Sequence, residues 1–96
     1  MYGTLAKMKA TKENQAKLKE AMAPASDRKI EGYRATYVLI PDQRDDEVWL
    51  LAVFDDEASY KKNAASPDQH QEYLKYRALL DEEPEWIDGQ IEVDEA

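Results

Sequence analysis

Hydrophobic and polar residues alternate over positions 2–10, which predicts a β-strand. The residues on one side of this strand are Tyr2, Thr4, Ala6, Met8 and Ala10. Those on the other side are Gly3, Leu5, Lys7 and Lys9. Neither side is strongly apolar, so the prediction rests on the period-two alternation itself.

Three further strands are predicted. Residues 32–40 and 47–54 are rich in aromatic and β-branched side chains. Residues 41–46 between them, PDQRDD, have no apolar side chain except proline, which indicates an antiparallel hairpin. A last strand is predicted over 85–93, with a turn or bulge at Asp88-Gly89.

The first predicted helix covers residues 12–22, which are strong helix formers. Thr11 offers a side-chain oxygen at the N-cap position. Apolar residues at i, i+4 and i+7 spacing form its buried face: Leu18, Met22 and Ala25. Pro24 and Ser26-Asp27 are expected to end or loosen the helix.

The second helical region is predicted to be split in two. A short helix over 57–65 comes first, and a longer helix runs from residue 67 to residue 80 or 81. Ser66 is placed as the N-cap of the longer helix, Pro67 as its first residue, and Gln69 three residues after Ser66 to complete a capping box.

The predicted order of elements is therefore β-α-β-β-α-β. This order is that of the ferredoxin-like α+β fold, an antiparallel four-stranded sheet with helices on one face. A chain of 96 residues suits one domain, residues 1–96.

The two central strands carry apolar residues on both faces, which helices on one side cannot cover. In 47–54, one face has Val48, Leu50, Ala52 and Phe54, and the other has Trp49, Leu51 and Val53. In 32–40, the two sets are Tyr33, Ala35, Tyr37 and Leu39, and Thr36, Val38 and Ile40. We expect a homodimer that packs sheet face to sheet face, since exposed apolar patches promote association. The alternative is that the last strand and tail cover the open face, although Glu92, Asp94 and Glu95 are poor cover.

Composition limits the partners and the location. The net charge of −8, from 21 acidic and 13 basic residues, disfavours nucleic-acid binding because phosphate backbones are repelled. The chain has no cysteine, which fits a reducing compartment. Residues 1–12 lack the apolar stretch of a secretory signal, and the longest apolar run, 48–54, is far below the roughly 20 residues of a membrane span. We expect a cytoplasmic protein with no membrane or nucleic-acid partner.

Three motifs carry a resemblance to a known family. The apolar strand ends in acidic residues and EAS-Y, the small residues of AASPD link two helices, and EPEWIDG precedes the terminal strand. The layout, with VWLLAVFDDEASYKKNAASPDQHQEY over residues 48–73, resembles the antibiotic biosynthesis monooxygenase-like family of dimeric α+β barrels.

This resemblance implies a cavity between the helices and the sheet. Some family members oxidise phenolic polycyclic substrates with molecular oxygen and no cofactor, others degrade haem, and many have no known activity. In the cofactor-free reaction the substrate supplies the electrons as an anion, while the protein shapes a dry pocket, helps remove a proton and stabilises an oxyanion. Haem-degrading members have a tryptophan where this chain has Asn63 and an axial histidine where it has Tyr73, so haem is not expected.

The candidate catalytic residues are Arg77, Tyr73, Asn63 and His70. The helical face that holds the first two also contains Tyr76 and Leu80. Arg77 there would stabilise a phenolate or enolate oxygen. Alternatively, the tyrosines pack the core and Arg77 pairs with an acidic neighbour. His70 suits a general base but equally fits the surface, and Asn63 either hydrogen-bonds in the pocket or helps end the short helix.

Neither a metal nor a cofactor is indicated. The single histidine has no partner at ligand spacing, and neither a calcium loop nor a glycine-rich phosphate loop is present. Trp49 and Trp86 are interpreted as packing residues. The leading hypothesis is a cofactor-independent monooxygenase-like protein that oxidises or binds a small aromatic or quinol-type molecule. The alternative is a non-catalytic dimeric module whose cavity is filled by its own aromatic side chains.

Overall fold

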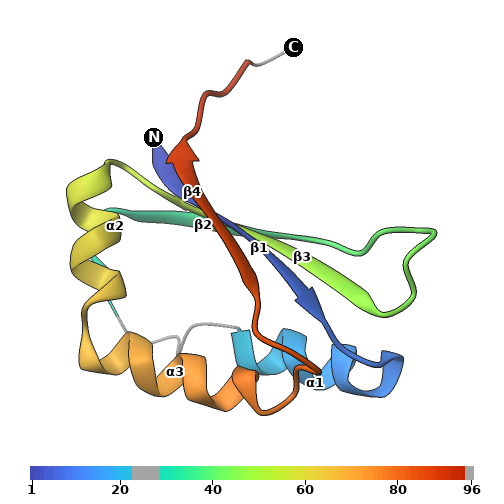
Figure 1. Cartoon of the computed structure of the whole chain (residues 1–96). Helices are drawn as coiled ribbons and strands as arrows, with labels where there is room; N and C mark the ends of the chain where they lie inside the picture. The colour runs from blue at the N-terminus through green and yellow to red at the C-terminus, as the bar shows by residue number, and fades with distance from the viewer. Residues whose placement is uncertain (23–28, 95–96) are drawn as a thin grey trace.

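The computed structural model describes residues 1–22 and 29–94, and its strands form one antiparallel sheet in the order β2-β3-β1-β4 (Figure 1). The elements along the chain are β1 (Tyr2–Lys9), α1 (Lys12–Met22), β2 (Tyr33–Leu39), β3 (Glu47–Phe54), α2 (Glu57–Ala64), α3 (Pro67–Arg77) and β4 (Glu85–Gln90). The predicted β-α-β-β-α-β order and the ferredoxin-like fold class are confirmed.

The helices α1, α2 and α3 all lie on the same side of the sheet (Figure 1). The hydrophobic core lies between the helices and the sheet. The alternation predicted for β1 places Ala6 and Met8 of that strand in the core. Its buried residues are Ala6, Met8, Ala10, Leu18, Val48, Tyr76 and Leu80. No helix in the described part of the chain is both long and apolar enough to cross a membrane.

Side-chain caps start the helices where the sequence predicts. The Asn14 N–H donates to Thr11 Oγ1 at 3.3 Å, and the Gln69 N–H donates to Ser66 Oγ at 3.1 Å. The Gln69 side chain, expected to complete a capping box, accepts a hydrogen bond from Asn63 Nδ2 at 3.2 Å. This contact ties the end of α2 to the start of α3.

Two predicted boundaries are wrong. The longer helix ends at Arg77, because the next turn tightens to i, i+3 hydrogen bonds and Asp81 N–H then donates to Lys9 in β1. The last strand ends at Gln90, and Asp88-Gly89 is neither a turn nor a bulge, since both residues pair regularly with β1. The expected helix-ending residues Pro24, Ser26 and Asp27 lie outside the described residues, as do Ala25, the Met22 side chain and Glu95.

A bulge in β2 changes which side chains face the helices. The register with β3 shifts between Tyr33 and Ala35, so the prediction that these two share a face is wrong. Tyr33 lies instead on the helix side, where its hydroxyl is 2.6 Å from the hydroxyl of Thr36. Because the bulge precedes Ala35, the rest of β2 keeps its predicted alternation.

None of the helices in the described part of the chain lies on the opposite face of the sheet (Figure 1). One cross-strand row on this face consists of Tyr37, Leu51, Leu5 and Ile87. Tyr37 and Leu39 are 63% and 57% exposed. Ile91 packs at the corner of this face at Gly3, where an added Cβ would lie 2.8 Å from Ile91 Cδ1. Val93 beyond it is 59% exposed, so the described tail leaves most of the face open.

Candidate ligand cavity between helices and sheet

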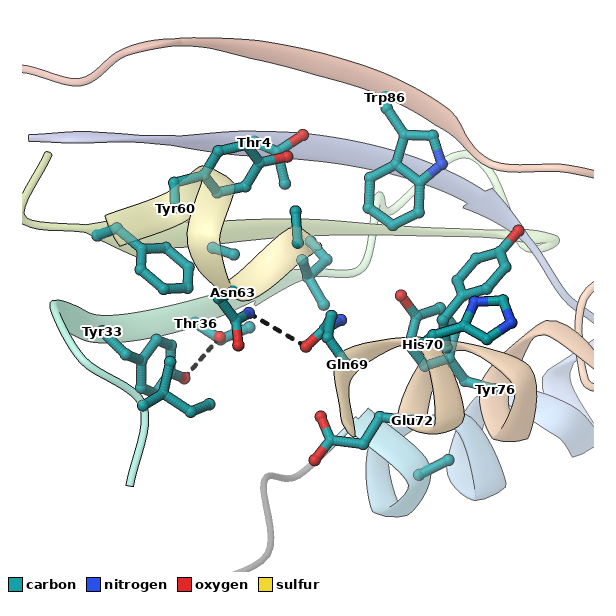
Figure 2. A pocket seen from close by; sticks show the side chains of 17 residues that line it. Thr4, Tyr33, Thr36, Tyr60, Asn63, Gln69, His70, Glu72, Tyr76 and Trp86 are labelled. Atoms are coloured by element: carbon teal, nitrogen blue, oxygen red, sulfur yellow. Dashed lines mark hydrogen bonds between the residues drawn. The ribbon is translucent and has the colours of Figure 1, made fainter. Parts of the chain in front are cut away.

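A cavity of about 330 Å³ lies between the helix-facing side of the sheet and the helices (Figure 2). Leu50, Ala52 and Phe54 of β3 form its floor, since they alternate on the inner face of that strand. The short α2 and the start of α3 supply most of its polar groups. The split helical region therefore creates one wall of the cavity, with Asn63 and Gln69 on either side of the link (Figure 2).

Six aromatic side chains among the described residues line the cavity: Tyr33, Phe54, Tyr60, Tyr73, Tyr76 and Trp86. They form two groups. In one, Phe54 lies between Tyr33 and Tyr60, with ring centroids 5.6 Å away in both cases. In the other, Tyr73 is 5.3 Å from Tyr76 and 6.1 Å from Trp86. The space between the two groups is suited to a flat, apolar ligand.

Several polar groups in the wall are already paired. The hydroxyls of Tyr33 and Thr36 bond to each other, and Asn63 donates to Gln69. The Tyr60 hydroxyl donates to Asp88 Oδ1 at 2.9 Å. Burial and then this hydrogen bond raise the pKa of Tyr60 to about 12, so its phenol stays protonated at neutral pH.

Tyr76 is different, because its hydroxyl accepts from and donates to none of the described residues. The residue is only 8% exposed, and burial raises the pKa of its phenol well above the ordinary value. Its ring packs in the core beside Tyr73, while its hydroxyl points from α3 toward the cavity (Figure 2).

Three of the four candidate residues from the sequence line the cavity: Asn63, His70 and Tyr73. His70 is exposed and stands at the mouth (Figure 2). Arg77 is not part of the lining; its Nε donates to Glu83 Oε1 at 3.1 Å and its Nη1 to the carbonyl of Leu80 at 3.3 Å. The structure thus pairs Arg77 with an acidic neighbour, as the alternative interpretation supposed.

The same Glu83 connects Arg77 to the cavity indirectly. The Tyr73 hydroxyl donates to Glu83 Oε2 at 2.8 Å. These two donors, Tyr73 first and then Arg77, lower the pKa of Glu83 below its ordinary value. The carboxylate therefore fixes the position of the Tyr73 ring in the wall, and Arg77 fixes the carboxylate.

Sequence reasoning did not select several residues of the wall: Thr4, Tyr33, Thr36, Tyr60, Gln69 and Trp86. Tyr33 was grouped with Ala35 on one face, whereas the bulge separates the two and places Tyr33 beside Thr36. Gln69 was interpreted only as a capping residue, although its spacing of seven from Tyr76 places both on one helical face. Among the described residues, no cluster of three or more His, Asp or Glu side chains is arranged to hold a metal ion.

A family model described as antibiotic biosynthesis monooxygenase matches residues 1–83. The chain belongs to this family. The matched region contains every described residue of the cavity wall except Trp86. This match confirms the family resemblance that the sequence motifs indicated.

Solved structures agree with this family assignment at the level of the fold. A Deinococcus radiodurans protein classed as a candidate antibiotic biosynthesis monooxygenase has a TM-score of 0.77 and 15% identity, over 100% of this chain and 97% of that one. A conserved Methanosarcina mazei protein has a TM-score of 0.74 and 17% identity, over 95% and 92%. SnoaB of Streptomyces nogalater, a cofactor-independent oxygenase, has a TM-score of 0.66 and 15% identity, over 98% and 97%. No curated protein matches the chain by sequence.

Proposed function

We propose that this protein binds a small phenol or quinol in the cavity and oxidises it with molecular oxygen, without metal, haem or flavin. One observation carries the proposal: a member of this family has a cavity of about 330 Å³ lined by six aromatic side chains and several hydroxyl and amide groups. Such a lining suits an apolar ring that bears a few oxygen atoms.

The size of the cavity limits the ligand. Ligand sites in proteins usually measure about 300–1,000 Å³, so a cavity of about 330 Å³ suits a molecule of one or two rings. The cofactor-independent activity printed for SnoaB supports the reaction class, although it belongs to that protein. A two-ring phenol such as 1-naphthol is therefore the first substrate to test.

The reaction needs only the substrate, dioxygen and a proton acceptor. The phenol loses its proton, and the resulting anion supplies the electrons that reduce dioxygen. One oxygen atom enters the ring carbon opposite the hydroxyl as a carbonyl, and the other leaves as water with the two hydrogens lost. 1-Naphthol and one dioxygen thus give 1,4-naphthoquinone and one water.

The residues of the wall have separate tasks in this proposal. His70, which is exposed and lines the cavity, takes the phenolic proton as the general base. Asn63 on α2 and Tyr73 on α3 orient the aromatic ring of the substrate. Arg77 acts as a positioning residue through Glu83, since its guanidinium contacts the carboxylate that holds Tyr73.

A homodimer through the open sheet face completes the proposal. The exposed Tyr37 and Leu39, with Leu51 in the adjacent strand, form an apolar surface that a second copy would cover. The cavity lies on the other side of the sheet, so each protomer would keep its own site.

Oxygen uptake with 1-naphthol tests the proposed reaction. Wild-type protein should consume one dioxygen for each naphthoquinone formed, above the rate without protein. Ala52→Leu, which places a larger side chain on the cavity floor, should abolish turnover, whereas Ala16→Leu on the exposed side of α1 should retain it.

The other outcomes separate the alternatives. If 1-naphthol binds but no oxygen is consumed, the protein binds aromatic molecules without oxidising them, and the proposed enzymatic activity is wrong. Absence of both binding and uptake, for 1-naphthol and for one-ring quinols, would favour a structural module and contradict the proposal.

A further inference from the structure

The Tyr76 hydroxyl in the cavity wall has no hydrogen-bond partner in the part of the chain that the structure describes. Tyr76 is 8% exposed, and its hydroxyl neither donates to nor accepts from any of residues 1–22 and 29–94. Buried hydroxyls in proteins are normally hydrogen-bonded, because an unsatisfied buried polar group is destabilising. A buried donor that faces a cavity is therefore a group for a ligand to satisfy.

Gln69 provides a second donor in the wall of the same cavity. Its Oε1 accepts from Asn63 Nδ2 at 3.2 Å, which orients the amide so that Nε2 faces away from α2. None of the described side chains or carbonyls accepts from Nε2. Residues 69 and 76 are two helical turns apart on α3, and Figure 2 shows the Gln69 amide and the Tyr76 hydroxyl directed into the same part of the cavity.

We propose that Tyr76 Oη and Gln69 Nε2 form a donor pair that binds one oxygen atom of the ligand. The proposal rests on the function proposed above, which places an aromatic ligand in this cavity, and it specifies the chemistry of that ligand. The ring must carry an oxygen that accepts two hydrogen bonds, which is a ketone carbonyl or a phenolic oxygen that becomes an anion.

The chemistry of the two donors favours this role. An amide nitrogen cannot lose its proton in the working pH range, and burial raises the pKa of the Tyr76 phenol, so both groups remain donors. Two donors fixed by α3 need no reorganisation when negative charge develops on the ligand oxygen. The pair would thus favour the phenolate over the neutral phenol. The phenolate is the form that reacts with oxygen.

A matched pair of probes isolates the ligand oxygen. 1-Tetralone and tetralin share one two-ring skeleton and differ at one carbon, which carries the ketone oxygen in 1-tetralone and two hydrogens in tetralin. The quantity to measure is the ratio of their dissociation constants, by calorimetry, for wild type and for Tyr76→Phe. This comparison removes the difference in hydration between the probes, since both proteins are measured with the same two compounds.

We expect Tyr76→Phe to reduce the preference for 1-tetralone over tetralin roughly tenfold, which is the loss of one hydrogen bond. Gln69→Glu, which keeps an acceptor for Asn63 and replaces the free donor by a charged oxygen, should reduce it at least as much. Tyr33→Phe removes a hydroxyl that is already bonded to Thr36, so it should change the ratio by less than about twofold. The unfolding temperature of ligand-free Tyr76→Phe should equal or exceed that of wild type, because the hydroxyl makes no hydrogen bond to residues 1–22 or 29–94.

The outcomes distinguish this inference from the proposed function. If both probes bind the wild-type protein and the ratio is the same in Tyr76→Phe, the donor pair is wrong while the ligand cavity stands. If neither probe binds the wild-type protein, then the claim of a cavity for aromatic ligands fails and the donor pair fails with it.

Discussion

At the scale of single residues, Tyr60 gives the clearest effect of pH. Its phenol is half-buried and donates to Asp88, and its pKa is raised to about 12 from the ordinary 10.0. The folded state therefore favours the protonated phenol more than the unfolded state does. This contribution to stability is complete below pH 10 and is lost as the pH rises through 12.

We predict that Tyr60→Phe flattens the alkaline loss of stability between pH 10 and pH 12. Denaturant unfolding at both pH values measures this, and the tyrosinate absorbance of the folded protein should show one fewer late-titrating group in the variant. Tyr37→Phe, at an exposed tyrosine, provides the control. An equal loss of stability with pH in wild type and Tyr60→Phe would contradict the assignment.

Arg77 and Glu83 should act on ligand binding as one unit. Because Arg77 lies outside the cavity lining and pairs with the carboxylate that holds Tyr73, Arg77→Ala should weaken 1-naphthol binding by no more than about fivefold. Glu83→Ala should have a similar effect, and the double variant should lose little more than either single one. Additive losses in calorimetric titrations would mean that Arg77 reaches the ligand by another route.

The sequence could place some site residues and not others for specific reasons. Asn63, His70 and Tyr73 follow from the family motif and from the face of α3, and all three line the cavity. The face of the sheet on which Tyr33 lies could not be predicted. A one-residue bulge moves Tyr33 to the face opposite Ala35, and the alternation of the sequence does not reveal the bulge. The contact between Arg77 and Glu83 depends on the path of the chain after α3, which the sequence does not specify.

At the scale of elements, local signals determine starts better than ends. The N-caps Thr11 and Ser66 fix where α1 and α3 begin, and β3 has the bounds that its apolar run predicts. The end of α3 was predicted about one turn too late. That end is set by a long-range contact, the hydrogen bond from Asp81 N–H to Lys9, which a helical pattern cannot reveal.

Gly32, which precedes β2, allows an element-level test. Its φ of 77° is unfavourable for other residues, and an added Cβ would lie 2.4 Å from Cβ and Oγ of Ser59 in α2. We predict that Gly32→Ala lowers the free energy of unfolding by more than about 1 kcal/mol, measured by denaturant unfolding.

Gly89 in β4 provides the matched control for that substitution. No atom lies within 4 Å of an added Cβ there, so Gly89→Ala should stay within about 0.5 kcal/mol of wild type. Equal effects at the two positions would contradict the backbone assignment at Gly32.

At the scale of the whole molecule, the element order sufficed to predict the fold, and the apolar pattern on both sheet faces predicted the open surface that the structure has. The dimer stays a prediction. Light scattering should give twice the mass of one 11.1 kDa chain. Leu51→Lys on the open face should give monomers, because a charged side chain would be buried between the sheets.

The matched control for the dimer is Leu74→Lys on α3. Leu74 is 47% exposed on the helix side, so the same chemical change there should leave the mass unchanged. A wild-type monomer at micromolar concentration, or a Leu51→Lys dimer, would contradict association through the sheet face.

The central claim is that the space between the two aromatic groups is a binding site for a small aromatic molecule. Thermal unfolding with and without 1-naphthol, compared between wild type and Ala52→Leu, tests it most directly. At a ligand concentration 100 times the dissociation constant, wild type should gain about 2.7 kcal/mol, a shift of several degrees. Ala52→Leu should show no shift, whereas an equal shift in both proteins, or none in either, would contradict the account.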